Sequence, residues 1–390
     1  MTKINKTREA VIVAYGRTPL ARAYKGSFAA THPIEYSAQA LKGVLEKIPQ
    51  LNTSDIEDVI VACATPDRYL TYNVGRLIAQ HAGLPDCVPG QTINRFCSSG
   101  LQAVANAANA IMAGQMDIVV AGGVEMMTGI SMNIAEEFKY AELEAQIPDT
   151  YLPMGLTAEN VAEHYEITRE EMEEMAVQSH QKAAKAQEAG KFDEEIIPII
   201  IKTDDGTIIV KADEGVRANT NMESLAGLKP CFKEDGVVTA ATSSQMTDGA
   251  AFTVVMSREK AEELGCKPIA RFVGFAVAGL GAGVMGLGPI VAVPKVMEKS
   301  GLSINDMDVI ELNEAFAAQA IACIKDLELP TDKINPNGGA MALGHPLGAT
   351  GTVLACKAIS ELKRINGKYA LITMCIGGGM GAAGIIELEK

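Results

Sequence analysis

Cys97 occupies a position where a nucleophilic thiol would be placed. It lies in the polar segment 92–104, directly before an Ala-rich stretch that ends at Gly114. This pattern predicts a helix that begins beside Cys97, with Ser98 and Ser99 as candidate caps. Unpaired backbone N–H groups and the positive end of a helix dipole favour a thiolate at such a position. A buried structural cysteine is the alternative, because free cysteines are among the most buried residues.

Two further candidates lie in loops of the C-terminal part. Asn313 ends a predicted strand, at the kind of position where open α/β folds bind ligands, although it can equally cap the helix that follows. His345 lies between Gly344 and Pro346 in a glycine-rich turn. A neutral imidazole can take a proton from a thiol, so His345 is a candidate base. A single loop hydrogen bond is the alternative interpretation of this histidine.

Cys375 is a second candidate thiol. It ends a predicted strand and precedes four glycines, at positions 377, 378, 379 and 381. The bare backbone of such a turn can approach a ligand closely and donate N–H groups to a developing oxyanion. Filling of the core is the alternative role for Cys375.

One glycine motif resembles a cofactor-binding pattern without predicting a cofactor. Residues 281–286 match the pattern GxGxxG of dinucleotide-binding folds. Pro289 is predicted to open the next helix, so these glycines precede the helix and do not form its first turn. The sequence therefore does not predict a nicotinamide cofactor.

Strands and helices alternate along both ends of the chain, which predicts a parallel or mixed sheet covered by helices. The predicted strands of the first part are 10–15, the end of 51–63, 88–93 and 117–124, and the predicted helices are 34–46 and 73–82. Between about residues 126 and 239, acidic helices (158–164 and 169–190) and the segment 196–210 indicate an inserted domain.

The first pattern returns after residue 270 with related sequence. Segment 54–61 has a counterpart in 303–312, and the segment from Ile93 to Gly123 is echoed between Ile334 and Gly379, where the predicted helix is 353–362. A period this long predicts two related domains. Two similar halves that face each other would form a site at their junction.

Composition limits the partners and the location of the protein. With 390 residues, 48% hydrophobic and 21% charged, the chain is predicted to be soluble and globular. Its net charge of −14 argues against a nucleic-acid partner. Eight cysteines without CxxC pairs predict reduced thiols in the cytoplasm and no metal site. No apolar run approaches the ~18 residues of a membrane span, and residues 1–8 do not resemble a signal peptide.

Together, four segments in this order resemble the thiolase family over essentially the whole chain: 94–100, 313–317, 344–346 and 375–381. The resemblance implies the α/β thiolase fold, in which two βαβαβαββ halves form a five-layer α-β-α-β-α core and a loop domain covers the ligand. The implied domains are an N-terminal half (1–125, completed by about 240–268), the inserted loop domain (126–239) and a C-terminal half (269–390).

The resemblance also implies roles for the candidate residues. Cys97 is expected to accept the acyl group and His345 to activate it as a base. Cys375 is expected to be a second acid/base with a pKa near neutrality, which exchanges a proton with the α-carbon of acetyl-CoA. Asn313 is expected to hold a water that forms one oxyanion hole with His345 Nε2, and the N–H groups of Cys97 and Gly377 the other.

Two departures from the usual acetoacetyl-CoA thiolase pattern favour the degradative 3-ketoacyl-CoA thiolases of fatty-acid β-oxidation. Pro153 stands where the acetoacetyl-CoA enzymes usually have His, and Cys-Ser-Ser-Gly replaces Cys-Gly-Ser-Gly. By the same resemblance, Met154 and Met285 would line the acyl pocket, and Arg217 and Ser244 would contact coenzyme A. Met is flexible enough to suit varied acyl chains.

The expected partners are coenzyme A thioesters and free coenzyme A, which is a substrate, so no cofactor is expected. The expected assembly is a homodimer or a homotetramer. An acetoacetyl-CoA thiolase is the nearest alternative function. A 3-ketoacyl synthase would pair its cysteine with His/His or His/Asn, and a non-catalytic acyl-CoA-binding or lipid-binding protein would be expected to have lost a catalytic residue.

Overall fold

The fold is built on one large mixed sheet. Its strands are β1 (Ala10–Arg17), β2 (Ala21–Arg22), β3 (Asp58–Ala62), β4 (Gln91–Ile93), β5 (Ile118–Met126), β8 (Thr247–Ser257), β9 (Ala270–Gly279), β10 (Val309–Leu312), β11 (Tyr369–Ile376) and β12 (Met380–Leu388). In the computed structural model, which describes residues 8–204 and 206–390, these ten strands pair in the order β10-β11-β12-β9-β1-β8-β5-β3-β4, and β2 pairs with β8.

The two ends of this sheet repeat one topology. In one half, β3 is parallel to β4 and β5, and the antiparallel β8 and β1 follow. In the other half, β10 is parallel to β11 and bridges to Ile334 in parallel, and the antiparallel β12 and β9 follow. This arrangement confirms the duplicated halves that the repeats predicted. The halves join where β1 and β9 pair, at Val11 with Arg271 and at Ile12 with Ala270.

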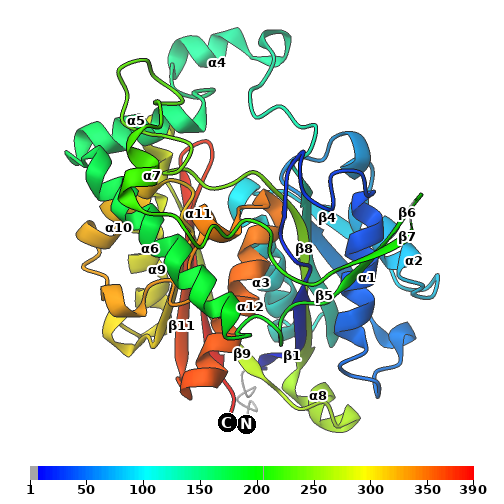
Figure 1. The fold of residues 1–390 in the computed structure, drawn as a ribbon. Helices are drawn as coiled ribbons and strands as arrows, with labels where there is room; N and C mark the ends of the chain where they lie inside the picture. The colour runs from blue at the N-terminus through cyan, green and yellow to red at the C-terminus, as the bar shows by residue number, and fades with distance from the viewer. Residues whose placement is uncertain (1–7, 205) are drawn as a thin grey trace.

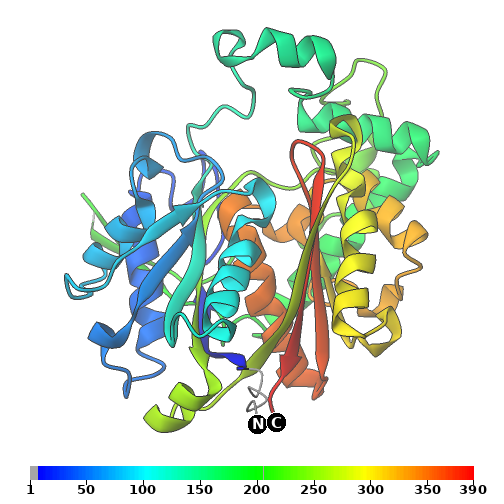
Figure 2. The same cartoon turned by 180° about the vertical axis from the view of Figure 1, so that it is seen from behind.

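Helices complete the predicted five layers. They are α1 (Pro33–Leu45), α2 (Val74–His81), α3 (Ser99–Met112), α4 (Ala141–Gln146), α5 (Met154–His164), α6 (Arg169–Glu188), α7 (Met222–Ala226), α8 (Arg258–Leu264), α9 (Gly288–Ser300), α10 (Ala317–Asp326), α11 (Ala340–Leu343) and α12 (Leu347–Ile365). Figures 1 and 2 show α3 and α12 between the two halves of the sheet. Helices α1 and α2 cover the outer face of one half, and α9 and α10 cover that of the other.

The two central helices approach each other closely at glycines. A Cβ at Gly351 of α12 would lie 2.2 Å from the backbone N of Leu101 in α3. A Cβ at Gly100 of α3 would lie 2.7 Å from the backbone N of Thr352 in α12. Helix α12 begins at Leu347, six residues before the predicted start, and residues 347–362 are buried. The prediction missed this first turn because glycines in it looked like loop residues, whereas they serve close helix packing.

The segment between β5 and β8 holds α4 to α7 and a hairpin of β6 (Ile199–Thr203) and β7 (Gly206–Val210). Helix α4 lies away from the sheet, at the top of Figure 1. The predicted helix 158–164 begins earlier, at Met154, and the segment 196–210 forms the hairpin. The limits predicted for the three domains stay predictions.

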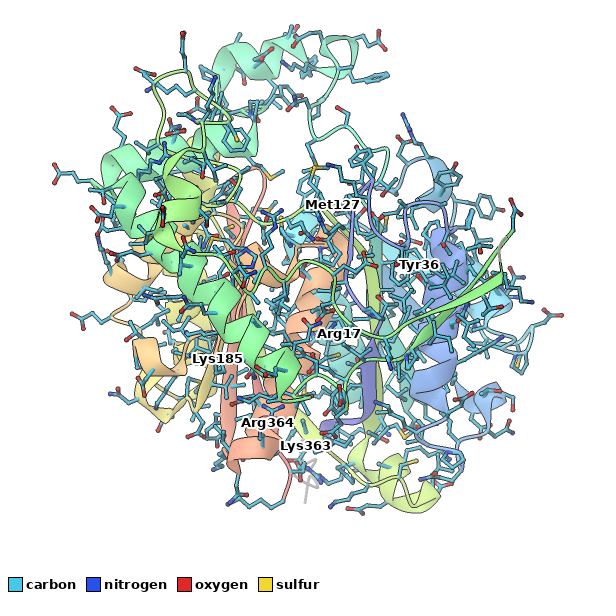
Figure 3. All side chains as sticks on the ribbon, viewed as in Figure 1. Arg17, Tyr36, Met127, Lys185, Lys363 and Arg364 are labelled. Carbon is cyan, nitrogen blue, oxygen red and sulfur yellow. The ribbon has the colours of Figure 1, made fainter. Side chains whose placement is uncertain are left out.

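A fully buried arginine anchors this segment to the sheet. Arg17 at the end of β1 has no exposed surface and lies at the centre of the molecule (Figure 3). Its Nε lies 2.8 Å from Glu195 Oε1 and its Nη1 lies 2.7 Å from Asp213 Oδ1. These two carboxylates, which belong to the segment between β5 and β8, compensate the buried positive charge.

Two expectations concern membranes and targeting. No helix in the described ranges is long and apolar enough to span a membrane. The prediction that the N-terminus carries no signal peptide rests largely on residues 1–7, which lie outside the described residues.

We predict that Gly351→Ala lowers the free energy of unfolding by about 1–3 kcal/mol, because its Cβ would overlap the backbone of α3. Alanine normally favours a helix over glycine, so a loss here isolates the packing effect. Urea unfolding measures it. Gly227→Ala is the control, because a Cβ there meets nothing within 4 Å. Equal stabilities of the Gly351 and Gly227 variants would contradict the packing account.

Candidate active site

Cys97 lies in a short 3-10 turn (Phe96–Ser98) that leads into α3. Helix α3 begins beside the cysteine, as predicted. The predicted caps do not act as caps, however: Ser98 Oγ donates to the carbonyl of Arg95, and Ser99 Oγ donates to the carbonyl of Phe96. Both hydroxyl groups stabilise the turn that carries the thiol.

A left-handed residue precedes the thiol. Phe96 has φ 44° and is 45% exposed. Asn94 supports this conformation, because its Oδ1 accepts from the backbone N–H of Phe96 at 2.8 Å and its Nδ2 donates to the carbonyl of Ala64 at 3.0 Å. A non-glycine residue with positive φ is held only where its surroundings determine it, which is common at active sites.

The Cys97 thiol is buried among apolar side chains. It is 3% exposed and packs with Ala64, Met127 and Leu347; Figure 3 labels Met127 beyond the end of β5. Burial raises the pKa of Cys97 to about 11, although the backbone N–H groups of Gly377 and of Cys97 itself lower it. The N–H groups at the helix start thus favour the thiolate as expected, but burial outweighs them, so the thiol needs a base.

His345 is held in an orientation that suits this task. Its Nδ1 lies 2.6 Å from Thr350 Oγ1, and its Nε2 lies 3.4 Å from Asn313 Nδ2. With the Nδ1 proton donated to Thr350, Nε2 carries the lone pair of a base. Burial lowers the pKa of His345 to about 4, so the neutral base form predominates at neutral pH. The preceding Gly344 has φ 109°, which favours glycine.

Asn313 directly follows β10 and faces the histidine. Its backbone N–H donates to the carbonyl of Thr373 at 3.0 Å, which continues the pairing of β10 with β11. Helix α10 starts at Ala317 with Phe316 at its N-cap position, so the alternative role of Asn313 as a helix cap is wrong. Its buried Oδ1 has no hydrogen-bond partner among the described residues and can accept from a ligand or water.

Cys375 completes the cluster at the end of β11. It is fully buried and packs with Met285, Ala315 and the partly buried Met154. Burial and the neighbouring Cys97 raise the pKa of Cys375 well above its usual value. The expected near-neutral pKa is therefore wrong, because sequence reasoning could not weigh the burial of this strand end.

The glycines after Cys375 form the turn into β12. Gly378 and Gly379 have φ 81° and 83°, whereas Gly377 presents its N–H to the Cys97 thiol. A Cβ at Gly377 would point towards Met154 Sδ, 3.6 Å away. The backbone of this turn therefore supplies a donor at the nucleophile.

The residues expected to contact substrate lie in two places. Met154 and Met285 pack against Cys375, and the backbone N–H of Ser244 donates to the carbonyl of Ala315 beside them at 2.9 Å. Arg217 is exposed on a loop, where its backbone N–H donates to His180 Nδ1 at 3.1 Å. The structure thus packs the two methionines against Cys375 and places Ser244 beside them through its backbone hydrogen bond.

The GxGxxG segment 281–286 behaves as predicted. Most of it forms a 3-10 turn (Ala282–Leu287), and α9 begins only at Gly288. A Cβ at Gly286 would lie 2.6 Å from Cβ of Gln319, so this glycine serves packing.

Sequence reasoning missed a buried carboxylate that ties the two halves together at the site. Glu125 Oε2 accepts from the backbone N–H groups of Ala64 at 2.9 Å and Gly348 at 2.8 Å, and its Oε1 accepts from Thr65 at 3.1 Å. It thus joins the loop after β3 to the first turn of α12. A charged residue at the end of an apolar strand was the signal that could have found it.

We predict that Thr350→Val slows acetylation of Cys97 by acetyl-CoA about 5- to 10-fold, because the imidazole loses the hydrogen bond that orients it. Rapid-quench mass spectrometry measures this rate. Thr352→Val on the same helix is the matched control, because its buried Oγ1 has no partner in the described part of the chain. Equal acetylation rates for the two variants would remove Thr350 from this role.

Comparisons with known proteins match both halves. The thiolase N-terminal domain matches residues 10–259, and the thiolase C-terminal domain matches residues 266–388. A 3-ketoacyl-CoA thiolase of Bacillus subtilis (strain 168) is 45% identical over 98% of this chain and 100% of that protein. The peroxisomal 3-ketoacyl-CoA thiolase A of Mus musculus is 44% identical over 97% of this chain and 90% of its own length.

A solved structure gives the same result for the fold. The crystal structure of the Bacillus anthracis acetyl-CoA acetyltransferase superimposes with a TM-score of 0.91 at 40% identity. The match covers 98% of this chain and 99% of that chain.

Proposed function

Because this chain belongs to the thiolase family, we propose that it is a 3-ketoacyl-CoA thiolase, an acyltransferase that uses coenzyme A to cleave a 3-ketoacyl-CoA into acetyl-CoA and a shortened acyl-CoA. The observation that carries the proposal is the cluster in which Asn313 contacts His345 and also pairs with β11 two residues before Cys375, which in turn neighbours Cys97. The reaction runs in reverse as a Claisen condensation.

Cleavage begins with the thiol of Cys97. His345 Nε2 takes its proton, and the resulting thiolate attacks the 3-keto carbon, whose oxygen becomes negatively charged. Burial disfavours both the thiolate and the imidazolium, so the proton moves as the developing oxyanion is stabilised. The N–H groups of Cys97 and Gly377 form one oxyanion hole, and His345 Nε2 with a water held by Asn313 forms the other.

Cys375 provides the second proton transfer. As the bond between the α- and β-carbons breaks, the Cys375 thiol protonates the α-carbon of the leaving acetyl-CoA, and Cys97 keeps the shortened acyl group. The Cys375 thiolate then takes the thiol proton of incoming coenzyme A, whose sulfur attacks the acyl group and releases Cys97. His345 returns its proton to Cys97, so the site is restored. Coenzyme A is a substrate, and the proposed reaction uses no further cofactor.

The acyl pocket favours substrates longer than acetoacetyl-CoA. Pro153 begins the turn into α5 and places Met154 against Cys375, with Met285 beside them. These methionines are flexible and apolar, so they can pack against acyl chains of different length. The names of the Bacillus subtilis and mouse relatives agree with this substrate class, and the Bacillus anthracis structure represents the acetoacetyl-CoA alternative.

The chain's assembly and location stay proposals. We place it in the cytoplasm as a homodimer or homotetramer. The edge strand β4 is followed by the exposed Phe96, and Tyr72 is 83% exposed in the loop before α2, so these aromatic side chains offer surface for a second copy. We further propose that Arg217 and Ser244 contact coenzyme A, because Ser244 bonds to Ala315 and the exposed loop of Arg217 follows Gly215, which lies against Gln245.

We predict that Cys97→Ala no longer acquires an acetyl group from acetyl-CoA and loses thiolysis by at least about 10³-fold, because no other group replaces the nucleophile. Intact-protein mass spectrometry detects the acetyl group. Cys375→Ala is the matched control, since it should still be acetylated while turnover is lost. A Cys97→Ala protein that is acetylated would refute the assignment of the nucleophile.

Thiolysis by the purified protein tests the substrate class. We predict faster turnover of a medium-chain 3-ketoacyl-CoA than of acetoacetyl-CoA, because the methionine-lined pocket gains apolar contact with each added methylene. Release of acetyl-CoA and loss of the 3-ketoacyl thioester measure turnover. Cleavage of acetoacetyl-CoA alone would keep the mechanism and reassign the substrate, and cleavage of neither would favour a non-catalytic binding protein.

A further inference from the structure

Gln319 lies in the first turn of α10, directly beside the second catalytic thiol. Its side chain is fully buried. Cys375 Sγ donates towards Gln319 Oε1 at 3.7 Å. Cys323, one turn further along α10, is also fully buried, and its Sγ donates towards the carbonyl of Gly286 at 3.5 Å. A neutral amide therefore lies beside the catalytic Cys375 and one helical turn from another buried thiol.

The orientation of this amide is fixed by the backbone. The N–H of Phe316 donates to Gln319 Oε1 at 3.3 Å, so the oxygen must face the start of the helix and Cys375. A flipped amide would point Nε2 at this N–H and set two donors against each other. Gly286 packs on Cβ of Gln319 and leaves the side chain little freedom.

Two polar groups lie at the Cys375 sulfur: the backbone N–H of Cys375 itself, which favours the thiolate, and the side-chain oxygen of Gln319. The ionisable groups that act on this sulfur are Cys97, from the turn before α3, and Cys323, from α10. The side chains packed around Cys375, which are those of Met285, Ala315, Met154 and Phe316, are apolar. An oxygen acceptor beside the sulfur favours the thiol, because it accepts from S–H and repels a thiolate.

We propose that Gln319 is a positioning residue that holds Cys375 as a thiol, with its S–H directed to Gln319 Oε1, so that the proton donor is loaded before the carbon–carbon bond breaks. This inference rests on the proposed function of Cys375. In cleavage, the proton leaves Sγ for the α-carbon of acetyl-CoA, and the thiol proton of coenzyme A replaces it. In condensation, the same acceptor limits the fraction of thiolate that can take a proton from acetyl-CoA.

Exchange of the methyl protons of acetyl-CoA with D₂O tests this role, because it needs the Cys375 thiolate. Gln319→Met removes the acceptor at similar volume, so exchange at neutral pH should rise about 3- to 10-fold and its pH profile should move down by about half a unit to one unit. Gln319→Glu places a carboxylate at the same point, so exchange should slow and the profile should move up. A merely structural residue would not produce opposite shifts.

The controls separate this inference from the proposed function. Each Gln319 variant is first checked for acetylation of Cys97, which shows that the site is folded. If one variant is not acetylated, the shift in the pH profile of the other variant decides the role of Gln319. Gln39→Leu, which removes an amide bonded to the backbone of Ile200 on the edge of β6, should match wild type. Cys375→Ala should show no exchange.

Two results would overturn the role of Gln319 while wild type still cleaves 3-ketoacyl-CoA. One is a wild-type pH profile in both variants, and the other is slower exchange in Gln319→Met, which would mean that the amide stabilises the thiolate. If wild type neither becomes acetylated nor exchanges protons, the proposed function fails and this inference fails with it.

Discussion

The close contact between α3 and α12 is the constraint on which the site depends. Cys97 directly precedes α3 and His345 lies just before α12, so the spacing of the two helices sets the spacing of nucleophile and base. Gly100 and Gly351 allow their backbones to meet, and Glu125 fixes the first turn of α12 to the opposite half. The sheet halves on either side hold both helices in place. The five-layer core therefore fixes the positions of the few residues that form the site.

Burial governs the electrostatics of this site. It raises the pKa of both catalytic thiols and lowers that of His345, so the resting cluster is neutral. Neutral groups can share a dry pocket, whereas a thiolate and an imidazolium there need compensation. The backbone N–H groups of Cys97 and Gly377 compensate the negative charge by hydrogen bonding as the oxyanion develops. The low dielectric that keeps the resting enzyme uncharged also strengthens those hydrogen bonds in the transition state.

Much of this arrangement could be predicted from the sequence, because its parts are local. The strand ends and glycine turns that carry Cys97, His345 and Cys375 were placed by their flanking residues, and the repeats indicated two halves. The raised pKa values of the two thiols could not be predicted, because their burial arises from packing between distant segments. Glu125 was missed for the same reason: its partner Gly348 lies 223 residues along the chain. Gln319 was not predicted either, because it lies in an Ala-rich helix and its partner Cys375 is 56 residues further along the chain.

The pairing of β1 with β9 has a mechanical consequence. It makes the strands of both halves one continuous ladder of hydrogen bonds, so opening the molecule between the halves would require breaking that ladder. The two halves therefore form one rigid unit and do not open and close relative to each other. Helix α4 lies outside this rigid unit, away from the sheet (Figure 1), so the ladder does not restrict the position of that helix. The catalytic residues at the junction of the halves are therefore held in a fixed geometry by backbone hydrogen bonds that run through both halves.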